Sequence, residues 1–143
     1  MKTNVSLNDV HMTQKRILLA DDSDLDVFLI KEAMRSFGID FVIERCSDGR
    51  AALDRLTRPD TVHELDLIIL DLNLPGMMGT EILRELRTRP DFDPIPIMML
   101  TSSISERDQE DAFRFRADAF LTKPSNLADF LAEVGGALQE MLH

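Results

Sequence analysis

The sequence predicts an α/β protein, a doubly wound five-stranded parallel sheet with helices on both faces. Short apolar segments alternate five times with segments whose apolar residues recur at helical spacing. This pattern is typical of repeated strand–helix units with right-handed crossovers. The clearest strand, residues 66–71, contains four consecutive large aliphatic residues, Leu67 to Leu70. A strand without polar alternation is buried on both faces, as in a parallel sheet covered by helices.

Residues 1–14 are polar and lack periodicity, so we expect a flexible N-terminal tail. Residues 15–143 are expected to form one domain, because no repeat or low-complexity segment divides them. The last predicted helix ends at the chain terminus, so no output domain is expected. The strands are predicted at residues 16–20, 41–43, 66–71, 95–100 and 119–121.

The first helix is expected to begin at a cap formed by Ser23 or Asp24 and to end at Gly38. Its apolar face consists of Leu29, Ile30, Ala33, Met34 and Phe37. The other helices are predicted over residues 50–56, 79–87, 105–116 and 126–142, the last with Leu127, Leu131, Val134 and Leu138 toward the core.

Composition argues against several classes of protein. The 26 acidic residues outnumber the 16 basic ones, giving a formal net charge of −10. That charge argues against binding to nucleic acid or to an anionic membrane. Cys46 is the single cysteine and is expected to be an inert buried thiol in a reducing compartment. Because the chain has neither a membrane-length apolar run nor a signal peptide, we expect a cytoplasmic protein.

Polar groups stand at the ends of four predicted strands. Asp21 and Asp22 follow the first strand, Asp71 ends the third, Thr101 follows the fourth and Lys123 comes just after the fifth. Since the carboxyl ends of parallel strands share one edge, where open α/β sheets bind ligands, we expect these groups to converge. Alone, Asp21 and Asp22 could cap a helix and Asp71 could be a turn residue. Their combination predicts a phosphoryl-transfer site.

The chemistry of these groups suits phosphoryl transfer. Close carboxylates repel one another, and a hard divalent cation such as Mg²⁺ relieves that repulsion by taking oxygen ligands. An aspartate can attack phosphorus and form an aspartyl phosphate. The cation and the Lys123 ammonium would neutralise charge on the phosphoryl oxygens, and the Thr101 hydroxyl could donate a hydrogen bond to one of them.

A known family carries the same set of motifs. Asp21-Asp22, Asp71 with Leu74-Pro75-Gly76, Thr101-Ser102 and Lys123-Pro124 together resemble the receiver domain of two-component response regulators. The resemblance covers residues 16–142 and implies the flavodoxin-like receiver fold with strand order 2-1-3-4-5. It also implies that Asp71 is the phosphoacceptor and that Lys123 pairs with the phosphoryl group.

The resemblance further implies a Mg²⁺ site in which Mn²⁺ can substitute. Asp22 would bind the cation directly and Asp21 mainly through water, completed by Asp71 and the backbone carbonyl of Asn73. Asn73 and Ser103 lie beside the acceptor, and we hypothesise that they tune the lifetime of the phosphorylated form, because the attacking water must pass them.

By the same resemblance the chain is a single-domain response regulator in a phosphorelay. Its phosphoryl donor would be a sensor histidine kinase or a histidine phosphotransfer protein. It would be no enzyme beyond its own phosphotransfer and autodephosphorylation. Thr101 and Phe120 would be the switch pair, the threonine moving toward the phosphoryl group and the ring turning inward. The switch would change the surface of the fourth helix, fifth strand and fifth helix for dimerisation or partner binding.

A narrower resemblance points to the phytochrome-associated single-domain regulators. It rests on Asp26-Val27, on the long connection over residues 87–96 and on the run from Leu100 to Ser103. It implies a bacterial phytochrome as the kinase and a homodimer.

Some apolar residues are predicted to lie off the core faces of their helices. They are either scattered surface residues or a partner surface, and the family resemblance implies that the first helix and the loop at Pro124 dock the kinase. The candidates are Val27, Phe28, Phe113, Pro124 and Phe130.

Two positions depart from the family pattern. Met78 stands where an aspartate is common, and Arg116 stands where a glycine usually ends the fourth helix. The second departure puts the left-handed turn before the fifth strand in doubt, because a residue other than glycine is strained there.

Three alternatives stay open. A phosphatase or phosphotransferase with an aspartate nucleophile would need a second carboxylate as acid/base, but Asn73 stands at that position. A flavodoxin-like cofactor carrier would need a phosphate loop rich in Ser, Thr and Gly, where this chain has Asp21 to Asp24. A receiver without an output target of its own, a phosphate sink or relay intermediate, would carry the same residues.

Overall fold

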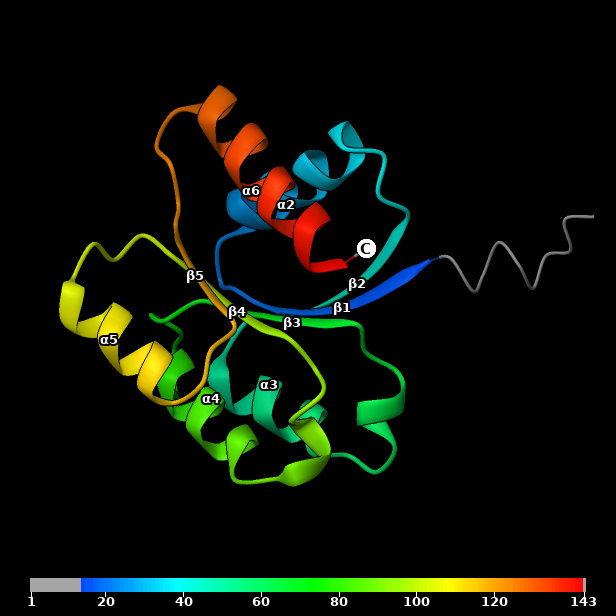
Figure 1. The fold of residues 1–143 in the computed structure, drawn as a ribbon, viewed down its shortest axis with the longest axis vertical. Helices are drawn as coiled ribbons and strands as arrows, with labels where there is room; N and C mark the ends of the chain where they lie inside the picture. The colour runs from blue at the N-terminus through cyan, green and yellow to red at the C-terminus, as the bar shows by residue number, and fades with distance from the viewer. Residues whose placement is uncertain (1–13, 143) are drawn as a thin grey trace, which may run out of the picture.

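The computed structural model describes residues 14–142 (Figure 1). The tail expected over residues 1–14 therefore lies, apart from Gln14, outside the described residues. The strands are β1 (Lys15–Ala20), β2 (Phe41–Cys46), β3 (Leu67–Leu70), β4 (Ile97–Thr101) and β5 (Ala119–Thr122). The helices are α2 (Asp24–Ser36), α3 (Gly49–Leu56), α4 (Gly79–Arg87), α5 (Glu106–Arg114) and α6 (Leu127–Leu142), with short 3₁₀ turns η1 (Thr61–His63) and η2 (Pro90–Phe92).

The strands form one parallel sheet in the order β2-β1-β3-β4-β5, which confirms the predicted fold and strand order. Helices α2 and α6 cover one face of the sheet, and α3, α4 and α5 cover the other (Figure 1). Because all strands run the same way, their carboxyl ends meet at one edge of the sheet.

The central strand β3 explains why the apolar run has no polar alternation. Leu67 and Ile69 pack in the cluster under α2 and α6, whereas Ile68 and Leu70 pack in the cluster under α3, α4 and α5. All four side chains are fully buried. Burial of each stabilises the fold by roughly 1.5–3 kcal/mol relative to exposure in water, so this strand holds the two layers together.

Several element boundaries differ from the predicted ones. Strand β2 continues past Ile43 to Cys46, because an edge strand tolerates the exposed Glu44 and the partly exposed Arg45. Strand β4 begins at Ile97, two residues later than predicted, after the two prolines that lack a ladder N–H. The prediction that Leu127 faces the core is wrong: it is 58% exposed, and the next two residues of α6, Ala128 and Asp129, are exposed as well.

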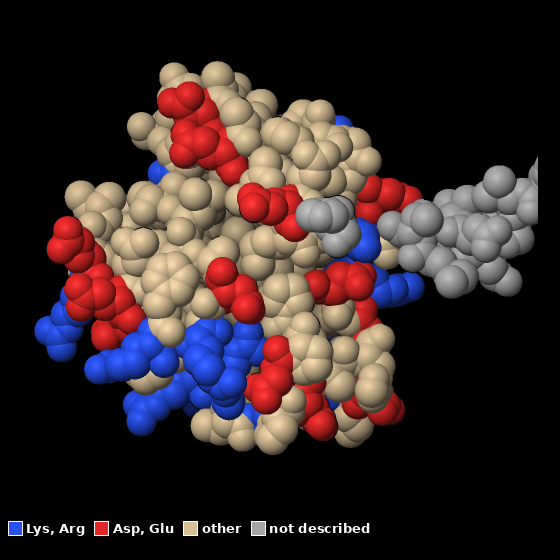
Figure 2. Space-filling model, viewed as in Figure 1, with Lys and Arg blue, Asp and Glu red and all other residues tan. Residues whose placement is uncertain are grey.

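The family departure at Arg116 is accommodated without a glycine. Helix α5 ends before it, and Arg116 takes the left-handed conformation with φ 69°. Its guanidinium donates to the Arg87 carbonyl at 2.7 Å, while Arg87 Nε donates to the Arg116 carbonyl at 3.1 Å. Figure 2 shows a cluster of basic side chains over α4 and α5, and Arg87 is the last residue of α4 while Arg116 follows α5. Tertiary contacts thus hold a conformation that the residue type disfavours.

The Arg87 side chain anchors this corner, since it is only 6% exposed. It also donates to the carbonyls of Phe92 and Ile95 and forms an ion pair with Asp118 at 2.8 Å. The same Asp118 oxygen accepts from the backbone N–H of Ile97. The start of β4 is therefore tied to α4 and to the loop before β5.

Within residues 14–142, no helix is both long and apolar enough to cross a membrane.

Arg116 gives a direct test of the strained turn. Arg116→Gly and Arg116→Ala both remove the guanidinium, but alanine keeps a β-carbon at positive φ. We expect the glycine variant to have the larger free energy of unfolding, by about 1 kcal/mol, in urea denaturation. At Arg114, the last residue of α5, we expect the opposite order: the alanine variant should have the larger free energy of unfolding. A less stable Arg116→Gly variant would show that the left-handed turn does not form in solution.

Candidate functional site

The predicted site residues gather where four strands end. Asp21 directly follows β1, Asp71 follows β3, Thr101 is the last residue of β4, and Lys123 follows β5. Asp21 and Asp71 are buried, as is Thr101, while Asp22 is exposed at the rim. The topology thus places carboxylates, a hydroxyl and an ammonium from distant parts of the chain at one edge of the sheet.

Lys123 lies at the centre of this site. Its ammonium Nζ donates to Asp21 Oδ2 at 2.8 Å, to Asp26 Oδ2 at 2.7 Å and to Asp71 Oδ2 at 2.8 Å. The lysine side chain is only 6% exposed. An ammonium has three hydrogens to donate, so all of them are used by carboxylates.

Asp26 is a site residue that sequence reasoning missed. In the sequence it supports only the narrower family resemblance, although it stands four residues after Asp22. Ser23 caps α2, accepting a hydrogen bond from the backbone N–H of Asp26 at 3.1 Å. The spacing of one helical turn from the cap residues was the signal that could have placed Asp26 at the same edge.

Three carboxylates could hold a cation. One oxygen from each of Asp21, Asp22 and Asp71 lies within 4.8 Å of the other two. Carboxylate oxygens suit a hard divalent ion such as Mg²⁺ or Mn²⁺, and exposed Asp22 leaves an open side for waters. The residues therefore fit the predicted metal. Asn73 is exposed, and its backbone N–H donates to Asp71 Oδ1 at 3.1 Å; the role of its carbonyl as a ligand stays a prediction.

Burial and charge act in opposite directions on these groups. Burial raises the pKa of Asp21 above its ordinary value, and hydrogen bonds from Lys123 and from the backbone N–H of Ser23 offset that rise only in part. Burial by itself would lower the pKa of Lys123, but hydrogen bonds to Asp21, Asp26 and Asp71 outweigh it and raise the pKa. Lys123 is therefore a permanent cation.

The loop that carries Asp71 is fixed by close backbone packing. Gly79 begins α4, and its N–H donates to the Leu72 carbonyl at 2.9 Å. A β-carbon at Gly79 would lie 2.1 Å from the carbonyl oxygen of Asp71, so only glycine allows this approach. Met78, the departure from the family pattern, precedes the helix with its side chain 44% exposed, and its N–H donates to Glu81 Oε1 at 3.4 Å.

The residues predicted to form the switch lie on adjacent strands. Thr101 is fully buried, and its Oγ1 accepts from the backbone N–H of Ser103 at 3.3 Å. Ser103 Oγ donates to Asp108 in α5 at 2.6 Å. Phe120 in β5 is partly buried against the cluster under α3, α4 and α5. The backbone N–H of Lys123 donates to the Thr101 carbonyl at 2.7 Å, so the site is continuous with the start of α5.

The predicted partner surface needs two corrections. Phe28 and Phe113 are exposed, at 56% and 47%, and Pro124 is half-buried. Val27 and Phe130, however, are 7% and 2% exposed and belong to the core under α2 and α6. The prediction that they lie off the core faces is wrong, because α2 and α6 pack against each other as well as on the sheet. Their buried faces are consequently wider than a single apolar stripe.

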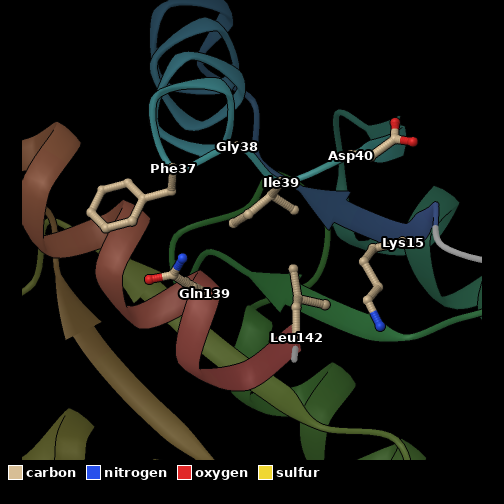
Figure 3. Close-up of a pocket in the computed structure, with 7 residues that line it drawn as sticks. All are labelled: Lys15, Phe37, Gly38, Ile39, Asp40, Gln139 and Leu142. Atoms are coloured by element: carbon tan, nitrogen blue, oxygen red, sulfur yellow. The ribbon is translucent and has the colours of Figure 1, made fainter.

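A pocket of about 380 Å³ lies elsewhere, at the amino end of β1 (Figure 3). Its lining combines Lys15 and Asp40 with apolar groups from the ends of α2 and α6, such as Phe37 and Leu142. It contains none of the strand-end residues described above, and ligands of open α/β sheets bind at the opposite edge.

Comparison with known proteins decides the family. The profile described as response regulator receiver domain matches residues 17–135. The chain belongs to the response regulator receiver family. The prediction from the motifs is confirmed, and this chain is the receiver domain of a response regulator in two-component signalling.

Two relatives match this receiver domain over most of their own length. The chain is 35% identical to response regulator Rcp1 from Synechocystis sp. over 133 residues, 91% of this chain and 90% of Rcp1. It is 33% identical to the probable methanogenesis regulatory protein FilR2 from Methanothrix harundinacea, over 79% of this chain and 74% of FilR2.

Solved receiver structures have the same fold. The Mn²⁺-bound form of Rcp1 superposes with a TM-score of 0.81 at 35% identity, covering 90% of this chain and 95% of that one. The phosphorylated cyanobacterial phytochrome response regulator RcpA superposes with a TM-score of 0.77 at 31% identity, covering 90% of this chain and 94% of the RcpA chain.

The raised pKa of Asp21 predicts a cost in stability. Because the folded state disfavours the charged carboxylate, Asp21 destabilises the fold once it is ionised. This cost is absent below the ordinary carboxyl pKa and is complete once the pH exceeds the folded-state pKa. In buffer with EDTA at pH 7, we expect Asp21→Asn to raise the free energy of unfolding by more than the roughly 0.5 kcal/mol of an ordinary surface substitution, and this gain should shrink toward pH 4.

Urea denaturation of both proteins across this pH range measures the difference. Asp54→Asn in α3, whose residue is exposed, is the control and should change stability by less than about 0.5 kcal/mol. An Asp21→Asn variant that is less stable than wild type at pH 7 without metal would contradict the burial argument.

Proposed function

We propose that this receiver domain accepts a phosphoryl group from a histidine donor on Asp71 in a Mg²⁺-dependent reaction, and that phosphorylation changes a binding surface. The observation that carries this proposal is the geometry around Lys123. One buried ammonium bonds both to Asp71 and to Asp21, two of the three carboxylates that can share a cation. Nucleophile, cation site and fixed positive charge thus lie together.

The reaction follows from the positions of these groups. An Asp71 carboxylate oxygen attacks the phosphorus, an acyl O–P bond forms, and the P–N bond to the donor imidazole breaks with its electron pair staying on the nitrogen. Asp21 and Asp22, with the backbone carbonyl of Asn73, would hold Mg²⁺, which supplies charge neutralisation for the phosphoryl oxygens when bound. Lys123 donates to one of those oxygens. The chemistry is completed on the protein itself, without a separate substrate being turned over.

The switch would act through contacts that already join the site to α5. The Thr101 hydroxyl would turn toward the phosphoryl group and release the Ser103 N–H that it accepts from. Ser103 in turn bonds to Asp108 on α5. Phe120, which is partly buried against the cluster under α3, α4 and α5, would turn inward behind Thr101. The surface of α5, β5 and α6 would therefore change, and exposed Phe113 makes it the site we propose for homodimerisation or output binding.

The proposed partner is a sensor histidine kinase or a histidine phosphotransfer protein. Similarity to RcpA, which is a phytochrome response regulator, supports a phytochrome as the kinase. The surface beside the acceptor offers exposed apolar residues for such a partner: Leu25 and Phe28 in α2, 65% and 56% exposed, and Leu127 at the start of α6, 58% exposed. A phosphate sink has the same chemistry, and a very short lifetime of the phosphorylated form would favour it.

Phosphorylation by a small donor tests the proposal. With acetyl phosphate and Mg²⁺, we expect intact-mass spectrometry to show one added phosphoryl group, and none with EDTA or in Asp71→Asn. The matched control is Asp66→Asn, just before the same strand at the opposite edge of the sheet, where its carboxylate accepts from the Arg16 N–H. This variant should be labelled like wild type. Folded, Mg²⁺-binding wild type that gains no adduct would rule out the proposed reaction.

The lifetime of the adduct tests the hypothesis on Asn73 and Ser103. Charged substitutions such as Asn73→Glu and Ser103→Lys should change the dephosphorylation rate by several-fold, because they alter the path of the attacking water. Ser102→Lys, on an exposed neighbour of Ser103, is the control and should leave the rate within about twofold. Equal decay in all variants, followed by mass after removal of the donor, contradicts the hypothesis.

A further inference from the structure

Lys123 has more counter-charges than the proposed reaction uses. Its three hydrogen bonds to Asp21, Asp26 and Asp71 are all 2.7–2.8 Å long. Asp21 and Asp71 also belong to the group of carboxylates that can hold a cation, whereas Asp26 does not. A bound cation would therefore contact Asp21 and Asp71, two of the three carboxylates that bond to Lys123, and would leave Asp26 unchanged.

Asp26 is placed independently of the cation site. It lies in the first turn of α2, where its own N–H is held by the Ser23 cap and the next N–H, from Val27, donates to the Ser23 carbonyl at 3.0 Å. Its side chain is 23% exposed, against 6% for the side chain of Lys123. A rigid helix end thus fixes a carboxylate against an ammonium that is almost completely withdrawn from water, where charge-assisted hydrogen bonds are strong.

The three hydrogens of the ammonium set a limit on what Lys123 can do. A phosphoryl oxygen that binds Lys123 must replace one of the three carboxylate oxygens. Phosphorylation converts Asp71 into an acyl phosphate, whose carboxyl oxygens carry no full charge and accept more weakly. The hydrogen that bonded Asp71 then becomes available for the phosphoryl group, while Asp26 keeps its full charge and its contact.

We infer that Asp26 is a positioning residue for phosphorylation: it holds the Lys123 ammonium beside Asp71 while the cation and the phosphoryl group occupy the other carboxylates. This inference rests on the proposed function of Asp71. It assigns Asp26 no part in binding the cation. Without Asp26, Lys123 loses the one anionic partner that the reaction leaves free, and its ammonium is no longer held toward the phosphoryl oxygens.

The test compares two acids of the same helix turn. Asp26→Asn keeps the shape of the side chain and removes its charge. Asp24→Asn is the matched control, since Asp24 is also in the first turn of α2 but pairs with Arg45 at 2.7 Å. With acetyl phosphate and saturating Mg²⁺, we expect Asp26→Asn to be phosphorylated about tenfold more slowly than wild type, the change typical of one lost charge-assisted hydrogen bond. Asp24→Asn should stay within about twofold.

Two further measurements separate positioning from other effects. Titration with Mg²⁺ should give affinities within about threefold for wild type and Asp26→Asn, because Asp26 is not a ligand. In ¹⁵N-labelled protein, the Lys123 ammonium should give an observable NMR signal, identified by its loss in Lys123→Met, because its buried protons exchange slowly with water. That signal should broaden or disappear in Asp26→Asn and persist in Asp24→Asn, which a merely structural role of the helix turn would not produce.

Three other results would overturn the inference on Asp26. Equal phosphorylation rates for Asp26→Asn and Asp24→Asn overturn the inference, and so does a rate that falls only as far as the Mg²⁺ affinity falls, since Asp26 would then act on the cation. If wild type itself gains no phosphoryl group, the proposed function fails and the inference fails with it. If wild type and Asp26→Asn are phosphorylated at the same rate, the inference fails and the proposed function stands.

Discussion

At the carboxyl edge of the sheet, the ammonium group of Lys123 lies 2.7–2.8 Å from three carboxylates, and a fourth, Asp22, lies at the rim of the same site. One cation cannot balance four anions, and buried unbalanced charge is costly. Burial raises the pKa of the Asp21 carboxyl, and the hydrogen bond and charge of Lys123 offset that rise only in part. The site is therefore incomplete in charge, and a divalent cation is the addition that its oxygen donors favour.

The fold is what makes this imbalance tolerable. Strand β3 is buried on both faces and delivers Asp71 to the edge, with α4 pressed so closely behind it that Gly79 contacts the Asp71 backbone. The Arg87 and Arg116 interlock ties the far ends of α4 and α5 to the start of β4. Apolar packing and these arginine contacts hold the frame, so the carboxylates can be kept close together for chemistry at some cost to stability.

The sequence predicted the parts of the site that follow from strand order and could not predict those that follow from side-chain reach. Asp21, Asp71, Thr101 and Lys123 converge because parallel strands share an edge, and a run such as Leu67 to Leu70 identifies the buried strand. Asp26 could not be predicted as a site residue, because an acidic residue in the first turn of a helix is common. Its hydrogen bond from Lys123, which follows β5, is visible only in the folded chain. Val27 and Phe130 were misplaced because helical periodicity describes one contact face, whereas α2 and α6 each have two, the sheet and the other helix.

The connections of Lys123 and Thr101 explain how a change at one aspartate could reach the protein surface. The backbone N–H of Lys123 donates to the Thr101 carbonyl, so the ends of β4 and β5 are joined directly. From Thr101 the path continues through the N–H of Ser103 and the hydroxyl of Ser103 to Asp108 in the first turn of α5. Each link is a single hydrogen bond, worth about 1 kcal/mol between neutral groups and about 1.5–3 kcal/mol for the bond to the Asp108 carboxylate. Such links are weak enough to be exchanged for bonds to a phosphoryl group and specific enough to carry that exchange to α5, whereas the buried strands behind them are too stable to respond.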